Sequence, residues 1–214
     1  MEEIEGKVFH LTLGGRFGDY PPVDEAGFLA FTKSLYTQKL YDLIKDAKRI
    51  AEITSHRFPT VVRRHYERLE TFPEGFLALG DAICSFNPVY GQGMSSAAMQ
   101  AEALQGLLSE RTQGTTGLEG VAGDFFARAA EVISTPWTLA ASADFAYPQT
   151  KGERPKDLEQ GARYFQALEA LSVTDVDVQI LIAEVLNLAR PLADLLTESL
   201  RSRVTEHLGK SANV

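Results

Sequence analysis

Residues 75–103, GFLALGDAICSFNPVYGQGMSSAAMQAEA, contain the clearest structural pattern in the chain. The apolar run at 75–80 lies between glycines, which is typical of a short strand buried on both faces of a sheet. The turn Gly91-Gln92-Gly93 follows, and the apolar residues after it recur three and four apart, which predicts one long helix to about residue 112. A buried strand, a loop and a helix in this order indicate an α/β arrangement, in which ligands bind beyond the carboxyl ends of the strands.

The same residues suggest a ligand site. Asp81 follows the predicted strand, so we expect its carboxylate to point into a cleft. Gly91 and Gly93 let the backbone approach a ligand, and the first helical turn presents unpaired N–H groups and a partial positive charge. A carboxylate before the loop and amide donors after it suit a ligand with hydroxyls at one end and carbonyls at the other. The structural alternative is a capping aspartate followed by ordinary turn glycines.

This stretch resembles the second flavin fingerprint of the FAD-dependent aromatic-hydroxylase-like monooxygenases. The matching strings are Gly80-Asp81-Ala82, Asn87-Pro88 and Gly91-Gln92-Gly93-Met94. The resemblance implies that Asp81 binds a ribityl hydroxyl of FAD, that Pro88 lies beside the isoalloxazine ring, and that the backbone of 91–95 faces the pyrimidine carbonyls. The predicted cofactor-binding residues are therefore Gly80, Asp81, Pro88, Gly91, Gln92, Gly93, Met94 and Ser95.

The function that the resemblance implies is an FAD-dependent oxidoreductase, a monooxygenase that hydroxylates or epoxidises a small organic substrate with O2 and NAD(P)H. In such chemistry the protein mainly positions the flavin and excludes water, so no side chain is assigned as catalytic. Relatives that reduce alkenes or halogenate also belong to the family, and these outcomes stay open. Arg16 and Arg57 are weaker candidates for a cation near the flavin or substrate. Tyr90 is a candidate for contact with the flavin, with a buried structural tyrosine as the alternative.

One part of the family pattern is missing from the sequence. The family begins with a strand, a G-x-G-x-x-G turn and a helix that hold the ADP half of FAD, and the nearest string, at 91–96, lacks the third glycine. We therefore expect a C-terminal fragment or split half, completed by an N-terminal-half polypeptide or by a homo-oligomer. The alternatives are a non-catalytic remnant or interaction subunit without flavin, and a helical binding module formed by 94–208.

The expected fold class is α/β (α+β): a partial flavin-monooxygenase fold with an incomplete mixed sheet, followed by a helical C-terminal region. Residues 1–74 are assigned to the substrate-binding domain, 75–112 to the second-fingerprint strand, loop and helix, and 113–214 to the helical region. The expected elements are a strand at 8–13, two short helices within 24–47, an extended segment at 60–66, and helices at 118–135 (ending before Pro136), 158–171, 176–189 and 192–208, with a loop at 148–157.

Composition narrows the choice of partners. Lys and Arg number 21 against 29 Asp and Glu, a net charge of −8 that argues against a nucleic-acid groove. No apolar run approaches the roughly 20 residues that span a bilayer, and the N-terminus MEEIEGK carries no signal, so we expect no membrane partner and a cytoplasmic location. Cys84 is expected to be a packed thiol, and no metal site is expected because the four histidines lack ligand spacing.

Overall fold

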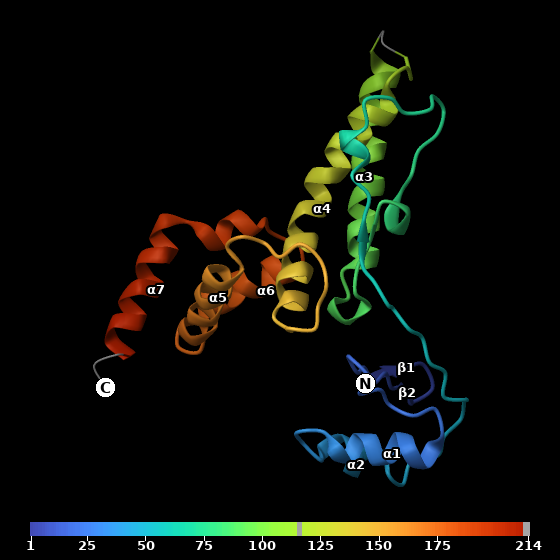
Figure 1. Ribbon diagram of the computed structural model, residues 1–214, viewed down its shortest axis with the longest axis vertical. Coiled ribbons are helices and arrows are strands. Elements are labelled where there is room, and N and C mark those ends of the chain that lie inside the picture. Colours follow the sequence, from blue (N-terminus) through green and yellow to red (C-terminus); the bar gives the residue numbers. More distant parts are fainter. Residues whose placement is uncertain (115–116, 212–214) are drawn as a thin grey trace. The chain divides into compact units, whose positions relative to one another are not determined.

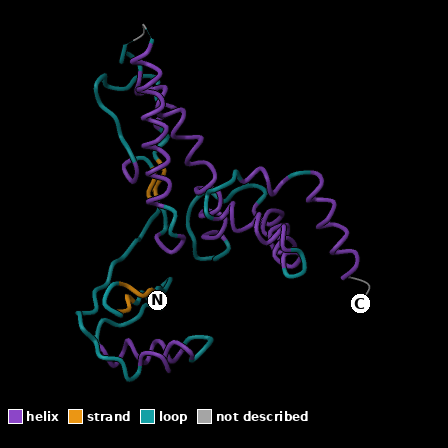
Figure 2. The backbone as a smooth tube through the Cα atoms, turned by 180° about the vertical axis from the view of Figure 1, so that it is seen from behind, coloured by secondary structure: helices purple, strands orange, loops and turns teal. Residues whose placement is uncertain are grey.

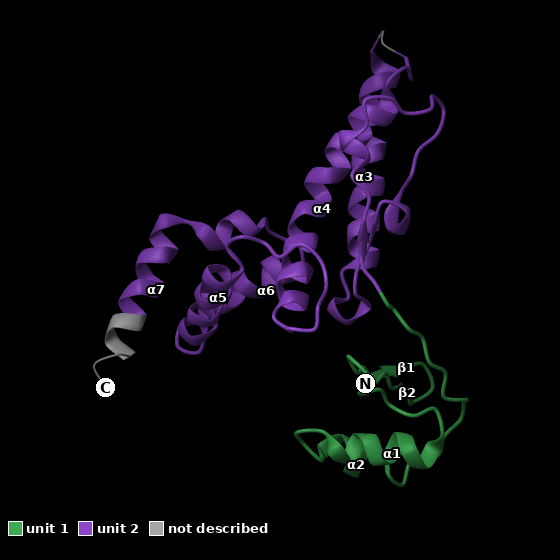
Figure 3. Cartoon of the chain, viewed as in Figure 1, with its two compact units in different colours: residues 1–59 green, residues 60–214 purple. Residues whose placement is uncertain are grey.

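The chain forms two compact units, residues 1–59 and 60–214 (Figure 3). The structure, a computed structural model, describes the backbone of residues 1–114 and 117–211 and the side chains of these ranges as far as residue 207. Within the described residues the protein is mostly helical, with two small antiparallel sheets. The mixed helix and strand content agrees with the expected class. The division into 1–74, 75–112 and 113–214 by role stays a prediction.

The first unit begins with a hairpin. Strand β1 (Glu2–Ile4) pairs antiparallel with β2 (Val8–His10), with Ile4 opposite Val8. Gly6 and Lys7 in the connecting turn both have positive φ, 79° and 59°. The strand expected over 8–13 is therefore shorter than predicted, because its partner strand ends after three residues and offers nothing further to pair with.

Two short helices follow, as predicted. Helix α1 (Glu25–Ser34) is capped by Asp24, whose Oδ1 accepts a hydrogen bond from the N–H of Gly27 at 2.8 Å. Helix α2 is Lys39–Ile44. The N-cap carboxylate satisfies one of the amides that a helix start leaves unpaired, so it explains where α1 begins.

The second unit is built on two long helices that lie side by side, α3 (Gly93–Gln113) and α4 (Val121–Phe145) (Figure 1). Phe125, Phe126 and Ile133 of α4 are almost completely buried in the core between these helices and the preceding loops. The other members of this core include Ala78, Ile83, Cys84, Phe86, Leu107 and Ala129. The start of α3 and its length confirm the helix predicted after Gly93.

Helix α4 does not end before Pro136, contrary to the prediction, and instead continues to Phe145. A proline inside a helix removes one backbone hydrogen bond and costs about 3 kcal/mol. Here the Pro136 ring is itself almost fully buried. Its packing, together with the long contact of α4 with α3, offsets that cost, and this tertiary effect is invisible in the local sequence pattern.

The apolar run at 75–80 is not a strand, which corrects the sequence prediction. Residues 75–79 lie in turns and irregular backbone, and Gly80 begins the 3₁₀ helix η2 (Gly80–Ala82). The short sheet of this unit instead pairs β3 (Val62–Arg63) antiparallel with β4 (Cys84–Ser85). A strand buried on both faces needs neighbours on each side, and none of the described residues pairs with 75–79, so Phe76 remains 58% exposed. The expected mixed sheet is likewise absent from the described part of the chain.

A second hydrophobic cluster is formed by the C-terminal helices, whose path is visible in Figure 2. Its elements are α5 (Leu158–Ser172), α6 (Val176–Leu186), the 3₁₀ helix η4 (Leu192–Leu196) and α7 (Glu198–Ser211). Leu168, Val178, Val185 and Leu195 are its most buried residues. The loop at 148–157 and the first two helices were predicted, whereas the helix expected at 192–208 is interrupted, since Thr197 is extended (ψ 148°) between η4 and α7.

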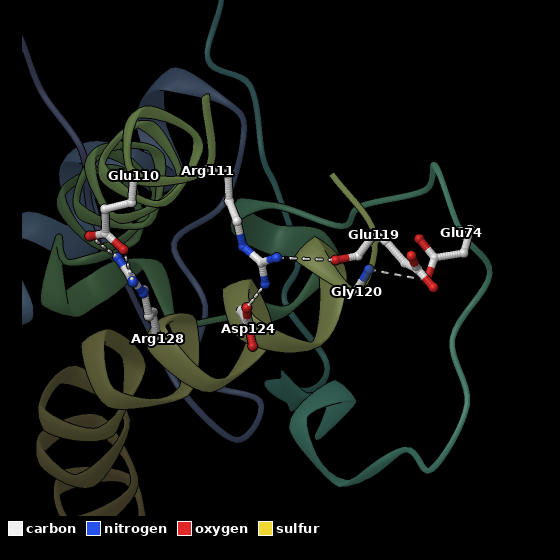
Figure 4. Close-up of polar contacts among 7 residues, drawn as sticks. All are labelled: Glu74, Glu110, Arg111, Glu119, Gly120, Asp124 and Arg128. Carbon is white, nitrogen blue, oxygen red and sulfur yellow. Dashed lines mark hydrogen bonds and ion pairs between the residues drawn. The ribbon is translucent and has the colours of Figure 1, made fainter. Parts of the chain in front are cut away.

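Ion pairs connect α3 and α4 near the C-terminal end of α3. Arg128 donates to Glu110 at 3.0 Å, and Arg111 pairs with Asp124. Figure 4 shows these residues with Glu119, whose carbonyl accepts from Arg111, and with Glu74, whose carboxylate accepts from the N–H of Gly120. All these contacts are exposed, so we expect them to orient the end of α3 against the start of α4 and to contribute little to the free energy of unfolding.

Candidate functional site

The Gly-Asp motif is attached to α3 through its backbone. The N–H of Gly80 donates to Oε1 of Gln100 at 2.9 Å, and Nε2 of Gln100 donates to Oγ of Ser96 at 3.2 Å. Gln100 and Ser96 are fully buried. Gly80 has φ +60°, a conformation that favours glycine. The motif and the second turn of α3 therefore form one connected piece of structure.

Asp81 is exposed and caps no helix. The N-cap residues of η2 and α3 are Leu79 and Gln92, and the Asp81 carboxylate makes no hydrogen bond to any described residue. The capping explanation for this aspartate is therefore not supported. Its carboxylate is available to a ligand hydroxyl beside the second turn of α3.

The loop between β4 and α3 contains the 3₁₀ helix η3 (Pro88–Tyr90). Oδ1 of Asn87 accepts from the N–H of Val89 at 3.2 Å, and the N–H of Gly91 donates to the carbonyl of Pro88 at 3.0 Å. Gly91 adopts φ +66°, which explains why glycine stands there. Pro88 and Gly91 are both exposed, so the loop presents them to solvent while Asn87 fixes its inner side.

A carboxylate from α4 holds the inner side of this loop. Oδ1 of Asp144 accepts from Nδ2 of Asn87 at 3.0 Å and from the hydroxyl of Tyr90 at 2.8 Å. Tyr90 also packs against the first core, so its structural role is the one that the contacts support. Sequence reasoning missed Asp144, whose only signal was a polar residue on a largely apolar helix face more than fifty positions away.

The start of α3 leaves amide donors without partners. The N–H of Ser96 bonds to the carbonyl of Gln92 at 2.9 Å, whereas those of Gly93, Met94 and Ser95 bond to no described residue, and no side chain caps the helix. Met94 is 87% exposed and Ser95 is exposed as well. These amides and the helix dipole give this end of α3 a partial positive charge that suits carbonyl oxygens or an anionic ring edge.

Gln92 supplies a buried acceptor at the same place. Its Nε2 donates to the carbonyl of Leu186 at 3.1 Å, at the end of α6, but its buried Oε1 has no partner among the described residues. A cavity of about 70 Å³ lies beside it, lined by Tyr90, Gly91, Gln92, Ser95, Leu186, Asn187 and Leu188. A buried acceptor without a donor costs free energy, about 1–3 kcal/mol, so this oxygen can accept a hydrogen bond from a donor that reaches it.

Three further residues that the sequence singled out are Cys84, Arg57 and Arg16. A role for the two arginines near a flavin or a substrate stays a prediction. Burial raises the pKa of the Cys84 thiol to about 12, with the charge of Arg63 acting in the opposite direction, so this thiol is packed and unreactive at neutral pH. Arg57 lies over the ring of Tyr20 at 5.7 Å within the first unit, which also contains Arg16. Residues 1–114 and 117–207 contain no group of three or more His, Cys, Asp or Glu side chains placed to hold a metal. None of the described helices combines the length and apolar character that crossing a bilayer requires.

Comparison with known proteins found a relative but did not assign the chain to a family. No family model matches the chain. A protein of Mycobacterium tuberculosis with the name Protein Rv3254 is 29% identical over 149 residues, which are 70% of this chain and 31% of the relative. The chain thus spans about a third of the length of this curated relative. The relative's name states no activity, and what the chain does is therefore argued from the site.

Proposed function

We propose that this chain is the second-fingerprint part of an FAD-dependent oxidoreductase, a monooxygenase that uses O2 and NAD(P)H on a small organic substrate. The observation that carries the proposal is the start of α3, where the amides of Gly93, Met94 and Ser95 lie in the same turn as the unpartnered Oε1 of Gln92. Asp81, joined to the same helix through Gly80 and Gln100, adds a carboxylate that makes no hydrogen bond to a described residue.

The donors and acceptors at this turn fit one edge of a flavin. The pyrimidine edge of the isoalloxazine ring carries two carbonyl oxygens separated by one N–H. Backbone amides of α3 suit the carbonyls, and Oε1 of Gln92 suits the N–H. The cavity of about 70 Å³ beside Gln92 has room for such an edge but not for the whole ring system. The rest of the flavin would have to be covered by further polypeptide.

Each residue has a defined task in this arrangement. Asp81 binds a hydroxyl of the ribityl chain, Pro88 and Gly91 provide the exposed rim of the loop, and the dipole of α3 stabilises negative charge on a ring at its N-terminus. When bound, FAD supplies the redox chemistry that no amino-acid side chain provides. The chain's own contribution is to bind, orient and polarise the cofactor.

The ADP half of FAD, NAD(P)H and most of the substrate pocket require a partner, either an N-terminal-half polypeptide or another copy of the chain. Support comes from apolar side chains exposed around the motif: Phe76 is 58%, Val89 61% and Met94 87% exposed. Exposed apolar groups gathered in one segment are typical of a surface that another polypeptide covers. The matched relative is also much longer than the aligned segment.

The test is a titration of the purified full chain with FAD, followed by visible absorption and flavin fluorescence, with and without any polypeptide encoded upstream. We expect Asp81→Ala to weaken FAD binding by about tenfold or more, the loss of a hydrogen bond to a charged group. Glu102→Ala is the control, since it removes an exposed carboxylate from α3 away from the motif. Once flavin is bound, NAD(P)H-driven oxygen consumption tests the monooxygenase class. Absence of flavin binding under every condition would favour the alternative, a non-catalytic remnant or interaction subunit.

A further inference from the structure

The loop that carries Pro88 and Gly91 is hydrogen-bonded to α4 through the carboxylate of Asp144. Asp144 is 9% exposed, and its Oδ1 receives hydrogen bonds from Nδ2 of Asn87 (3.0 Å) and from the hydroxyl of Tyr90 (2.8 Å). These two residues flank η3. One buried acceptor atom therefore contacts the loop on both sides of Pro88 and Val89.

The chemistry of a carboxylate makes this contact directional. Asn87 turns its amide nitrogen toward Oδ1 of Asp144, so the amide donates and the carboxylate oxygen accepts. Its oxygen then faces the N–H of Val89, which it binds at 3.2 Å. The orientation of Asn87, and through it the start of η3, is therefore set by Asp144.

Asp144 is itself held in place. Its backbone carbonyl accepts from the N–H of Tyr147 at 3.2 Å and from Oγ1 of Thr150, so the end of α4 is tied to the loop that follows it. Pro88 and Gly91, in the same segment, are exposed. A change at Asp144 would thus move the exposed rim without removing any group that faces a ligand.

We propose that Asp144 is a positioning residue for the flavin loop: it holds residues 87–91 in the conformation that presents Pro88 and Gly91 to the ring. This inference rests on the proposed function for its ligand, but the positioning itself is measurable without a cofactor. Asp144 acts through Asn87 and Tyr90 and is not a catalytic residue.

The experiment compares Asp144→Ala, Asp144→Asn and Tyr90→Phe with Glu131→Ala, which removes an exposed carboxylate from the same helix. Hydrogen exchange of the Tyr90 and Gly91 amides in the full chain reports the loop directly. We expect exchange about tenfold or more faster in Asp144→Ala, a smaller increase in Tyr90→Phe, and no change in Glu131→Ala. Asp144→Asn keeps an acceptor oxygen and is expected to restore part of the protection.

FAD affinity, measured on the same variants, separates positioning from mere support of the fold. We expect the variants with faster amide exchange to bind FAD more weakly, so Asp144→Ala should bind it more weakly than Tyr90→Phe, and Glu131→Ala should be unaffected. If Asp144→Ala folds and its Tyr90 and Gly91 amides exchange as slowly as in the unsubstituted chain, the proposal is overturned. It is also overturned if these amides exchange faster but the variant binds FAD as tightly as an unsubstituted chain that does bind it. If Asp144→Ala does not fold, Tyr90→Phe decides by the same criteria. If the unsubstituted chain binds no flavin with or without the upstream polypeptide, the proposed function fails while amide exchange still decides whether Asp144 positions the loop.

Discussion

The N–H of Gly80 donates to Oε1 of Gln100 at 2.9 Å, a bond that joins the Gly-Asp motif to a helix beginning thirteen residues later. Both partners are buried, and Nε2 of Gln100 donates a second hydrogen bond to Oγ of Ser96. The oxygen and the nitrogen of a glutamine in the middle of the helix thereby each have a hydrogen-bond partner. The bond fixes the distance between Asp81 and α3, on which the proposed ligand site depends.

Replacement of Gln100 by alanine is expected to destabilise the protein. Gln100→Ala leaves the buried N–H of Gly80 without an acceptor and the hydroxyl of Ser96 without a donor, at a cost of about 1–3 kcal/mol. Urea unfolding followed by circular dichroism measures the change. Gln105→Ala, on the exposed side of the same helix, should stay within about 0.5 kcal/mol. Equal midpoints for the two variants would show that the Gly80 contact contributes nothing.

The glycines at 91 and 93 are expected to respond differently to alanine. A Cβ at either position would meet no atom within 4 Å, so neither substitution clashes. Gly91 has φ +66°, and Gly91→Ala should cost about 1 kcal/mol of unfolding free energy. Gly93 begins α3 without a positive φ, so Gly93→Ala should be neutral or stabilising. Thermal unfolding of both variants provides the comparison, and a loss at Gly93 equal to that at Gly91 contradicts this account.

The Cys84 thiol is expected to resist modification in the folded protein. Burial raises its pKa to about 12, so almost no thiolate exists at pH 8, and the side chain is 1% exposed. Ellman's reagent should therefore react about a hundredfold more slowly with the native chain than with the chain in concentrated urea. Rapid labelling under native conditions would indicate that the β3–β4 sheet opens.

Sequence reasoning located most helices because their apolar spacing is a local property. The start of α3 at Gly93 and the helices α5 and α6 follow directly from it. The interruption at Thr197 did not, because Leu192, Leu196, Leu200 and Val204 recur four apart in the sequence while the backbone at Thr197 is extended. The buried residues on either side of the break are Leu195 and Leu200, five apart, so the apolar spacing does not record which residues face the core there.

The errors at 75–80 and at Pro136 have a common cause. Both segments depend on neighbours that are distant in sequence: a strand requires adjacent strands, and a proline in a helix is tolerated only where packing offsets the lost bond. No strand among the described residues pairs with 75–79, whereas Pro136 is buried. The candidate site shows the same limit, since Asp81 and Gly91 are predicted from their motif whereas Asp144 is recognisable only through its bonds to Asn87 and Tyr90.

Asp175 is expected to make the second cluster sensitive to acid. It caps α6 by accepting from the N–H of Val178 at 3.3 Å, and it pairs with Arg203 of α7. The hydrogen bond from Arg203 lowers the pKa of Asp175 below its usual 3.8, although partial burial acts in the opposite direction. Because the folded-state pKa lies below the unfolded one, this stabilisation is complete above the unfolded pKa and is lost as the pH falls through the folded pKa.

Asp175→Asn tests this linkage, since asparagine remains a good cap but cannot carry the charge. We expect the variant to be less stable than the unsubstituted chain at pH 7, and the difference to shrink toward zero as the pH is lowered below 4, measured by urea unfolding across that range. Asp157→Asn is the matched control, because Asp157 occupies the N-cap of α5 without making a capping bond. If the difference in unfolding free energy between Asp175→Asn and the unsubstituted chain persists unchanged into acid, the effect comes from the cap alone and the pair with Arg203 does not contribute.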